Sequence, residues 1–145
     1  MVHGPEKLTL KCLYSHHLGG YNASLNEPYE IFQIDFDKKE VYWETDGKFR
    51  KTETSYLDSF EFDNETIKFK LYVEYLPKQP YVYTINRTSG TLEIRKLDKR
   101  TDNERLESWN KYYKDDKQIN WDKEKLLRPN TWTAYFECEK LEKKF

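Results

Sequence analysis

Two adjacent histidines, His16 and His17, follow Cys12 closely, and together these three residues could do chemistry. Neutral imidazole and thiolate both bind transition metals. No carboxylate or second cysteine lies at a spacing usual for zinc, and Cys138 could complete a site only if the terminal strands met. A histidine could also activate a neighbouring thiol as a nucleophile, but both cysteines lie at positions that predict burial, where thiols are inert. We therefore predict no metal ligand and no catalytic residue, and interpret the histidines as an exposed pair in a glycine-rich loop.

Four carboxylates gather in one short stretch, and paired carboxylates do acid–base chemistry when their surroundings separate their pKa values. These residues are Asp35, Asp37, Glu40 and Glu44. Two lysines, Lys38 and Lys39, lie among them, so the stretch is interpreted as a solvated hairpin edge whose charges oppose aggregation. A small enzyme that uses His16, His17 and nearby carboxylates is the third hypothesis for function, and a protein without catalysis is favoured over it.

Aromatic and basic residues are interleaved in one part of the chain, a pairing that binds single-stranded nucleic acid by stacking. The residues are Tyr72, Tyr75, Tyr81, Tyr83, Arg87 and Arg95. Acidic residues are interspersed with them, and the whole chain has 25 basic and 26 acidic side chains, so no basic stripe forms. We do not expect a nucleic-acid partner. Phosphate-binding glycine motifs and the common hydrolase and calcium motifs are also missing from the sequence, and no cofactor is predicted.

The composition is that of a folded, aromatic-rich chain. It has 145 residues, with 8 Phe, 4 Trp and 12 Tyr, too many aromatic residues for a solvating tail. No run of about 18 apolar residues exists that could span a membrane as a helix. The N-terminus lacks the apolar stretch of a signal peptide, so the default is a cytoplasmic protein of a bacterial host with two free thiols. Secretion and a bridge between Cys12 and Cys138 both stay open, because such a bridge would remove much unfolded-state entropy.

Period-two alternation of apolar residues through the first 100 residues predicts half-buried strands. Leu8, Leu10 and Cys12 form one face of the first strand, and a loop is expected over residues 15–28. Three hairpins follow, around residues 32–43, 60–73 and 81–94, and another strand is expected within residues 48–57. In the first hairpin we expect Phe36 opposite Val41, and Ile34 opposite Trp43, around a four-residue loop. In the second we expect Phe62 opposite Ile67, and Phe60 opposite Phe69.

The pattern then changes to that of a helix. The segment Thr101-Asp-Asn-Glu104 has the spacing of a capping box, and the stripe of Leu106, Trp109 and Tyr113 predicts a helix over residues 102–116. A second short helix is expected near 121–127. The last strand places Trp132, Ala134, Phe136 and Cys138 on one face.

Together these elements predict a single domain over residues 1–145, mainly β in an α+β arrangement. It is an antiparallel meander of about eight strands, strongly curved or closed into a small barrel, because closure removes exposed edges. Both cysteines fall on core faces of the terminal strands, which fits first and last strands that meet. The helix is expected across a mouth or an outer face of the barrel.

Two hairpin sequences, Ile34-Asp-Phe-Asp-Lys-Lys-Glu-Val41 and Tyr83-Thr-Ile-Asn-Arg-Thr-Ser-Gly-Thr-Leu92, are followed late in the chain by Glu137-Cys-Glu-Lys140. In these motifs the chain resembles small uncharacterised β-rich proteins of bacteriophages and marine bacteria. The motifs cover about a fifth of the chain, and the resemblance implies no activity. The architecture is similar to lipocalin-like small barrels, but a fold does not assign a function.

The surplus of aromatic residues leads to the functional prediction, because Tyr and Trp are enriched at interfaces and in apolar pockets. We expect a non-catalytic binding module that engages a protein partner through exposed aromatic residues, in a phage–host setting. The alternative is a calyx that binds a small apolar ligand. The residues expected to line that calyx are Trp43, Phe60, Phe62, Phe69, Tyr83 and Trp132. An enclosed cavity of about 300 Å³ or more would favour the calyx, and a filled interior would favour the partner protein.

Overall fold

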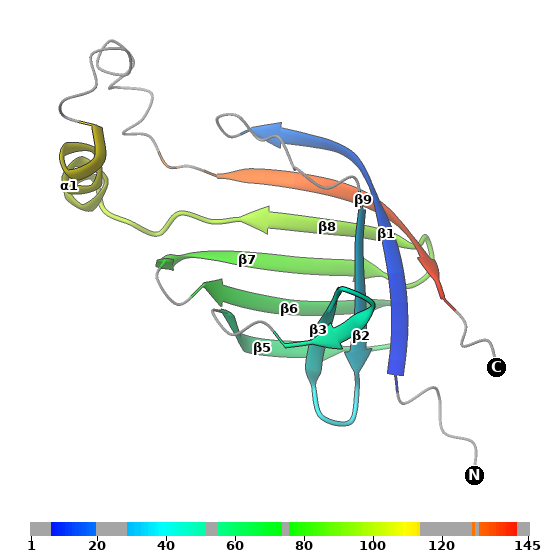
Figure 1. The fold of residues 1–145 in the computed structure, drawn as a ribbon. Helices are drawn as coiled ribbons and strands as arrows, with labels where there is room; N and C mark the ends of the chain where they lie inside the picture. Colours follow the sequence, from blue (N-terminus) through cyan, green and yellow to red (C-terminus); the bar gives the residue numbers. More distant parts are fainter. Residues whose placement is uncertain are drawn as a thin grey trace.

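The computed structural model describes residues 7–19, 29–51, 55–73, 76–113, 129 and 131–141. Nine antiparallel strands form one sheet that curls into a half-barrel, which confirms the predicted mainly β meander (Figure 1). The strands are β1 (Lys7–Gly19), β2 (Tyr29–Asp35), β3 (Glu40–Thr45), β4 (Lys48–Arg50), β5 (Ser55–Phe62), β6 (Thr66–Val73), β7 (Leu76–Asn86), β8 (Thr91–Lys96) and β9 (Trp132–Lys140). Strand order across the sheet is β4-β3-β2-β1-β9-β8-β7-β6-β5.

The first and last strands meet, as predicted, but they join in the middle of the sheet and do not close a barrel. β1 and β9 form its longest ladder, in which Cys12 lies directly opposite Cys138. The two cysteines form a disulfide across a sequence separation of 126 residues. The default expectation of two free thiols is therefore wrong. Alternating apolar residues on both strands bring the two side chains to the same face of neighbouring strands, where the thiols meet.

Register in the second hairpin follows the prediction, and in the first it differs. Phe62 opposes Ile67, and Phe60 opposes Phe69. In the first hairpin Ile34, and not Phe36, opposes Val41. The Oδ1 atom of Asp35 accepts a hydrogen bond from the backbone N–H of Lys38 at 3.0 Å, which starts the four-residue turn earlier. The shift is two residues, so every side chain keeps its predicted face.

β1 continues well beyond the predicted first strand. It runs to Gly19, so the loop expected from residue 15 does not begin there, and residues 20–28 lie outside the described part of the chain. A bulge between Tyr14 and His16 lets β1 stay paired with β9 over this length. The histidines therefore lie on a strand and not in a glycine-rich loop.

The core lies inside the curl of the sheet and comes from the inward positions of its strands. Its members are Leu8, Leu10, Cys12, Phe32, Ile34, Val41, Ile67, Phe69, Leu71, Tyr83, Ile85, Leu92, Ile94, Ala134 and Phe136. These residues recur at every second position, as the sequence pattern required.

The helix α1 (Asp102–Tyr113) begins with the predicted capping box. Thr101 Oγ1 accepts a hydrogen bond from the backbone N–H of Glu104 at 3.2 Å, and Glu104 Oε1 accepts one from the backbone N–H of Thr101 at 3.1 Å. α1 lies beyond the end of β8, away from the concave face, and not across a mouth of the sheet (Figure 1). Residues 114–128, with the second predicted helix, lie outside the described residues. Within the described residues, no helix has the length and apolar character to cross a membrane.

Candidate binding site at the opening of the half-barrel

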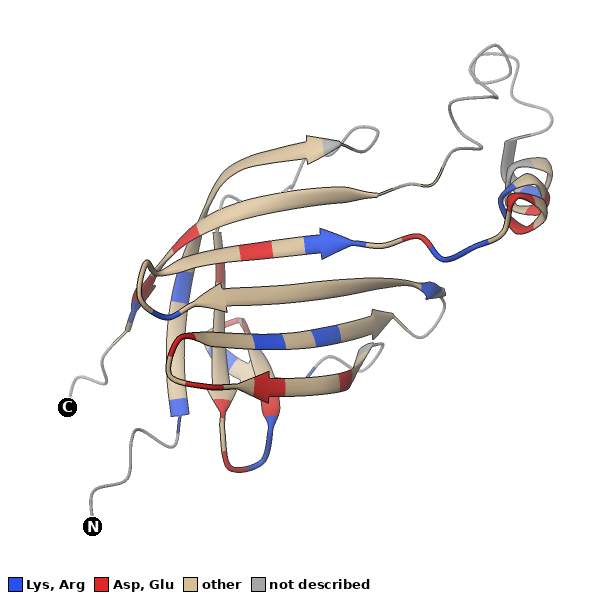
Figure 2. Ribbon diagram, turned by 180° about the vertical axis from the view of Figure 1, so that it is seen from behind, with Lys and Arg blue, Asp and Glu red and all other residues tan. Residues whose placement is uncertain are grey.

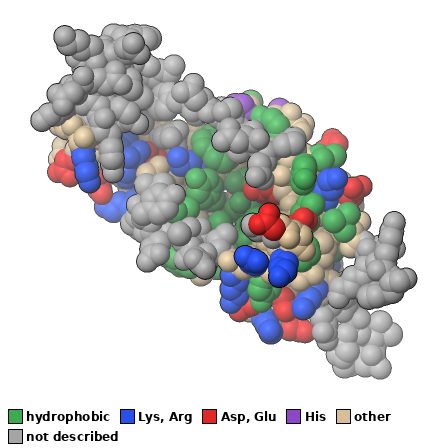
Figure 3. Space-filling model, in the orientation of Figure 1, with side chains coloured by type: hydrophobic (Ala, Val, Ile, Leu, Met, Phe, Trp, Pro, Cys, Tyr) green, Lys and Arg blue, Asp and Glu red, His purple; other side chains and the backbone are tan. Residues whose placement is uncertain are grey.

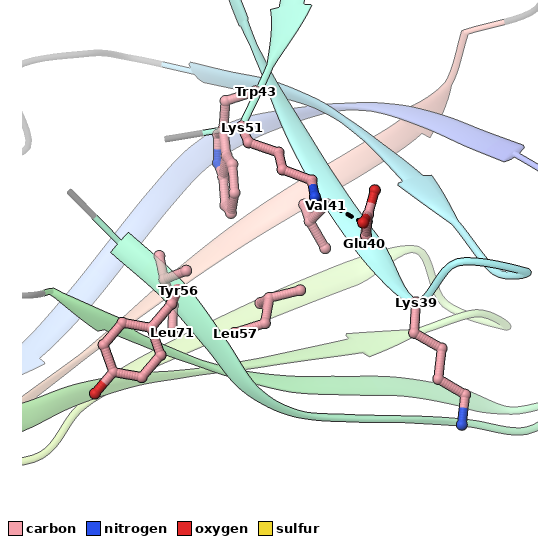
Figure 4. Close-up of a pocket in the computed structure, with 8 residues that line it drawn as sticks. All are labelled: Lys39, Glu40, Val41, Trp43, Lys51, Tyr56, Leu57 and Leu71. Carbon is pink, nitrogen blue, oxygen red and sulfur yellow. Dashed lines mark hydrogen bonds and ion pairs between the residues drawn. The ribbon is translucent and has the colours of Figure 1, made fainter. Parts of the chain in front are cut away.

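The half-barrel stays open between β4 and β5, which follow one another in the chain but lie at opposite edges of the sheet. β4 pairs only with Trp43–Thr45 of β3, so Glu40–Tyr42 have no strand beside them on that side in the described part of the chain. A cavity of about 220 Å³, open to solvent, lies here. It is lined by Lys39, Glu40, Val41, Trp43, Lys51, Tyr56, Leu57 and Leu71 (Figure 4).

Two apolar walls face each other across this cavity. Val41 and Trp43 come from β3, and Leu57 and Leu71 come from the paired strands β5 and β6 (Figure 4). Val41 and Leu71 belong to the buried core, and Trp43 and Leu57 pack against it. The walls are therefore continuous with the interior and are held by its packing.

The rim of the opening is charged. Lys51 Nζ donates a hydrogen bond to Glu40 Oε1 at 2.6 Å, and the Tyr42 hydroxyl donates one to Glu40 Oε2. These bonds, that from Lys51 first, hold the pKa of Glu40 below its ordinary value. The hydrogen bond to Glu40, assisted by burial, raises the pKa of Tyr42 to about 12. Lys39 lies at the other end of the opening, in the turn before β3, with a left-handed φ of 54°.

Behind the cavity, aromatic rings fill the interior. The ring centroids of Phe32 and Trp43 lie 6.3 Å apart, those of Trp43 and Tyr83 6.3 Å, and those of Phe69 and Tyr83 4.7 Å. Phe60 stacks on Phe69 with centroids 6.0 Å apart. Burial is the main cause that raises the pKa of Tyr83 well above its ordinary value, so its hydroxyl stays neutral. The interior along this row is packed with side chains, and the cavity is an open recess in front of it.

The six residues predicted to line a calyx divide into four groups. Trp43 lines the cavity, whereas Phe60, Phe69 and Tyr83 stack behind it. Phe62 is 45% exposed and packs against Phe36 from the β2–β3 turn, with centroids 4.9 Å apart. This contact joins the two halves of the sheet at one end of the opening.

The sixth of these residues, Trp132, packs against Tyr81 instead, with centroids 5.9 Å apart. It does not line the cavity. The lining residues that the sequence did not indicate are Lys39, Glu40, Val41, Lys51, Tyr56, Leu57 and Leu71. They come from three separate strands and two connecting segments, and no sequence pattern marked them as a group.

Exposed aromatic side chains accompany the opening. Phe49 of β4 is 37% exposed, and Tyr56 and Phe62 of β5 are 51% and 45% exposed. These are the two edge strands of the sheet. Hydrophobic side chains gather in the middle of the face seen in Figure 1, with lysines, arginines and carboxylates around them (Figure 3).

The histidines are not arranged to bind a metal ion with Cys12 or to activate its thiol. His16 stacks on Tyr135 with centroids 4.7 Å apart and bonds the Ser15 hydroxyl, while His17 Nδ1 bonds the Tyr14 hydroxyl. Cys12, the nearest thiol, is consumed in the disulfide. Among the described residues, no group of three or more His, Cys, Asp or Glu is placed to hold a metal ion.

Two of the four carboxylates of the first hairpin have structural roles. Asp35 is buried and holds the turn through Lys38, and Glu40 pairs with Lys51. The interpretation of a wholly solvated edge is therefore wrong for Asp35.

The pairing of aromatic and basic residues does not form a stripe along the strands. β5 carries only acidic charged residues and its neighbour β6 only lysines, and β8 carries both signs (Figure 2). Of the tyrosines considered, Tyr83 is buried in the core, and Tyr75 lies outside the described residues.

Comparison of the chain with protein-family models, with curated proteins and with solved structures finds no match. The resemblance to phage and marine bacterial proteins therefore stays a prediction, and the site has to be interpreted from its own chemistry.

Proposed function

We propose that the protein is a non-catalytic binding module that engages a partner protein at the opening between β4 and β5. The carrying observation is that exposed Phe49, Tyr56 and Phe62 lie on the two edge strands that flank an open, apolar-walled cavity. Exposed aromatic residues beside a recess are typical of interfaces, because each ring offers a large apolar area at a small cost in conformational entropy.

The size of the cavity supports a partner protein over the calyx. Pockets that enclose a small ligand measure about 300–1,000 Å³. This cavity measures about 220 Å³ and is open, and aromatic side chains fill the space behind it. A calyx for a small apolar ligand stays the second candidate, supported by the apolar walls of Val41, Leu57 and Leu71.

The disulfide bears on where such a module works. Disulfides persist mainly in oxidising compartments and are rare in the cytosol. We therefore favour an extracytoplasmic or extracellular site of action over the cytoplasmic default, and the phage–host setting stays a prediction.

Affinity capture with a matched control tests the proposal. The oxidised protein on beads is compared with the double variant Phe49→Ser/Tyr56→Ser in extracts of cells that carry the gene, with captured proteins identified by mass spectrometry. The control is Leu13→Ser/Leu18→Ser, which also removes two exposed apolar side chains but on β1, away from the edge strands.

We expect a protein that is retained by the wild type and by the control and is lost with the edge-strand variant. Equal capture by all three forms, or no capture above that of bare beads, would refute the proposal. Far-ultraviolet circular dichroism of each variant shows that the sheet is intact.

A further inference from the structure

We propose that the disulfide between Cys12 and Cys138 is a redox-sensitive switch that sets how far the half-barrel opens. The oxidised bridge holds the sheet tightly curled, and reduction lets the β1–β4 half rotate away from the β5–β9 half. The inference does not depend on the partner protein proposed above, because it concerns the width of the opening and not what occupies it.

The disulfide joins β1 and β9 at a point where their backbones do not bond to each other. Cys138 donates its backbone N–H to the Gly90 carbonyl oxygen at 2.7 Å, and thus away from β1. Both backbone groups of a residue in an antiparallel ladder point to the same neighbour, so Cys12 and Cys138 form a non-hydrogen-bonded pair. The bulge between Tyr14 and His16 interrupts the same ladder close by. The S–S bond therefore links the two strands where the backbone links them least.

The bond also lies on the concave face of the sheet. Cys12 belongs to the buried core, and Cys138 packs against it. Facing residues of an ordinary strand pair hold their Cβ atoms about 4.5–5.5 Å apart, whereas a disulfide draws them to about 3.8 Å. Because this shortening acts on one face alone, it bends the two strands towards that face and increases the curl of the sheet.

A small change of angle between β1 and β9 moves the edges of the sheet much farther. β4 lies three strands from β1, which is about 14 Å at the usual strand spacing, so a relaxation of about 10° moves this edge by about 2–3 Å. Across the interior, the two halves touch through aromatic rings. The ring centroids of Phe36 and Phe62 lie 4.9 Å apart, and those of Trp43 and Tyr83 lie 6.3 Å apart. A displacement of this size separates such contacts, because dispersion forces act only at close approach.

Cys138 is the entry point for the reductant, because it is half-buried whereas Cys12 is fully buried. A thiolate of a dithiol reductant attacks Sγ of Cys138 and forms a mixed disulfide, and Cys12 leaves as a thiolate that takes up a proton. The second thiol of the reductant then attacks the reductant's own sulfur in the mixed disulfide. This step releases Cys138 as a thiol and leaves the reductant as a disulfide, so two electrons and two protons pass to the protein.

A distance measured across the opening tests the inference. Gadolinium labels, which a thiol reductant leaves intact, are attached through a non-canonical amino acid at the exposed positions of Lys48 on β4 and Glu61 on β5. The matched control pair carries labels at Glu61 and Arg95, which both lie in the β5–β9 half. Pulsed electron paramagnetic resonance gives both distances in the oxidised protein, in the reduced protein and in the variant Cys12→Ala/Cys138→Ala.

Reduction should lengthen the distance across the opening by at least about 2–3 Å and leave the distance of the control pair unchanged. The double-alanine variant should show the longer distance with and without reductant. Reoxidation of the wild type should restore the shorter distance.

An unchanged distance across the opening in the reduced protein would overturn the inference. Equal changes in both label pairs would also overturn it, because they report partial unfolding and leave the disulfide a purely structural bridge. If reduction unfolds the wild type, Cys12→Val/Cys138→Ala, which keeps an apolar pair at this position, is measured in its place. Loss of the fold in this variant as well, or the same distance as in the oxidised wild type, excludes the switch.

Discussion

Reduction of the disulfide between Cys12 and Cys138 should destabilise the protein more than any single surface substitution. The bridge links β1 to β9, whose pairing joins the β1–β4 half of the sheet to the β5–β9 half. For a closed loop of 126 residues, the chain-entropy relation gives a stabilisation of about 5 kcal/mol. At roughly 2–4 °C per kcal/mol for a chain of this size, the midpoint of thermal unfolding should fall by roughly 10–20 °C.

The assay compares oxidised and reduced wild-type protein by circular dichroism, in denaturant and during heating, with the redox state verified by a mass difference of two hydrogens. Because both forms have the same sequence, no cavity from a substitution enters the comparison. The control is Cys12→Ala/Cys138→Ala, whose stability should not respond to reductant. If the reduced protein unfolds within about 1 kcal/mol of the oxidised form, the reasoning fails, because the unfolded chain would then gain little freedom from the loss of the bridge.

Three further predictions concern local features. Gly90→Ala should destabilise the protein more than Gly47→Ala in urea unfolding, because both have φ near +77° but only at Gly90 would a Cβ lie 3.0 Å from a backbone carbonyl oxygen; equal losses would contradict this. Thr101→Ala should remove about 1 kcal/mol from the end of α1 and lower helical ellipticity, and unchanged ellipticity would argue against the capping box. Glu40→Gln should lower the pKa of Tyr42 from about 12 towards 10 in an ultraviolet difference titration. In the wild type, the hydrogen bond from Tyr42 to Glu40 stabilises the fold below pH 10, and this stabilisation is lost as the pH rises through 12.

Local chemistry determined much of this structure in the sequence itself. The two-residue period of Phe60, Phe62, Ile67 and Phe69 sets the face on which each side chain of its hairpin lies, because a slip by one residue would turn every apolar side chain to water. Thr101 likewise marks the start of α1, since its capping partner lies only three residues away.

Tertiary structure decided whatever depended on contacts between distant segments. In the first hairpin, the Asp35 side chain chose a turn that alternation alone left open, because a shift by two residues preserves both faces. The length of β1 beyond Tyr14 depends on its ladder with β9, a partner more than 100 residues away. No local signal encodes such pairing.

The candidate site was determined almost wholly by the tertiary structure. Trp43 is the one lining residue that aromatic content indicated, whereas Val41, Leu57 and Leu71 read as ordinary core positions in the sequence. They line a cavity only because the sheet curls and leaves its two edges apart at β4 and β5. The sequence thus determined which side chains point inward, and the closure of the sheet determined which of them stay accessible, because an opening is a property of the whole curled sheet and of no single strand.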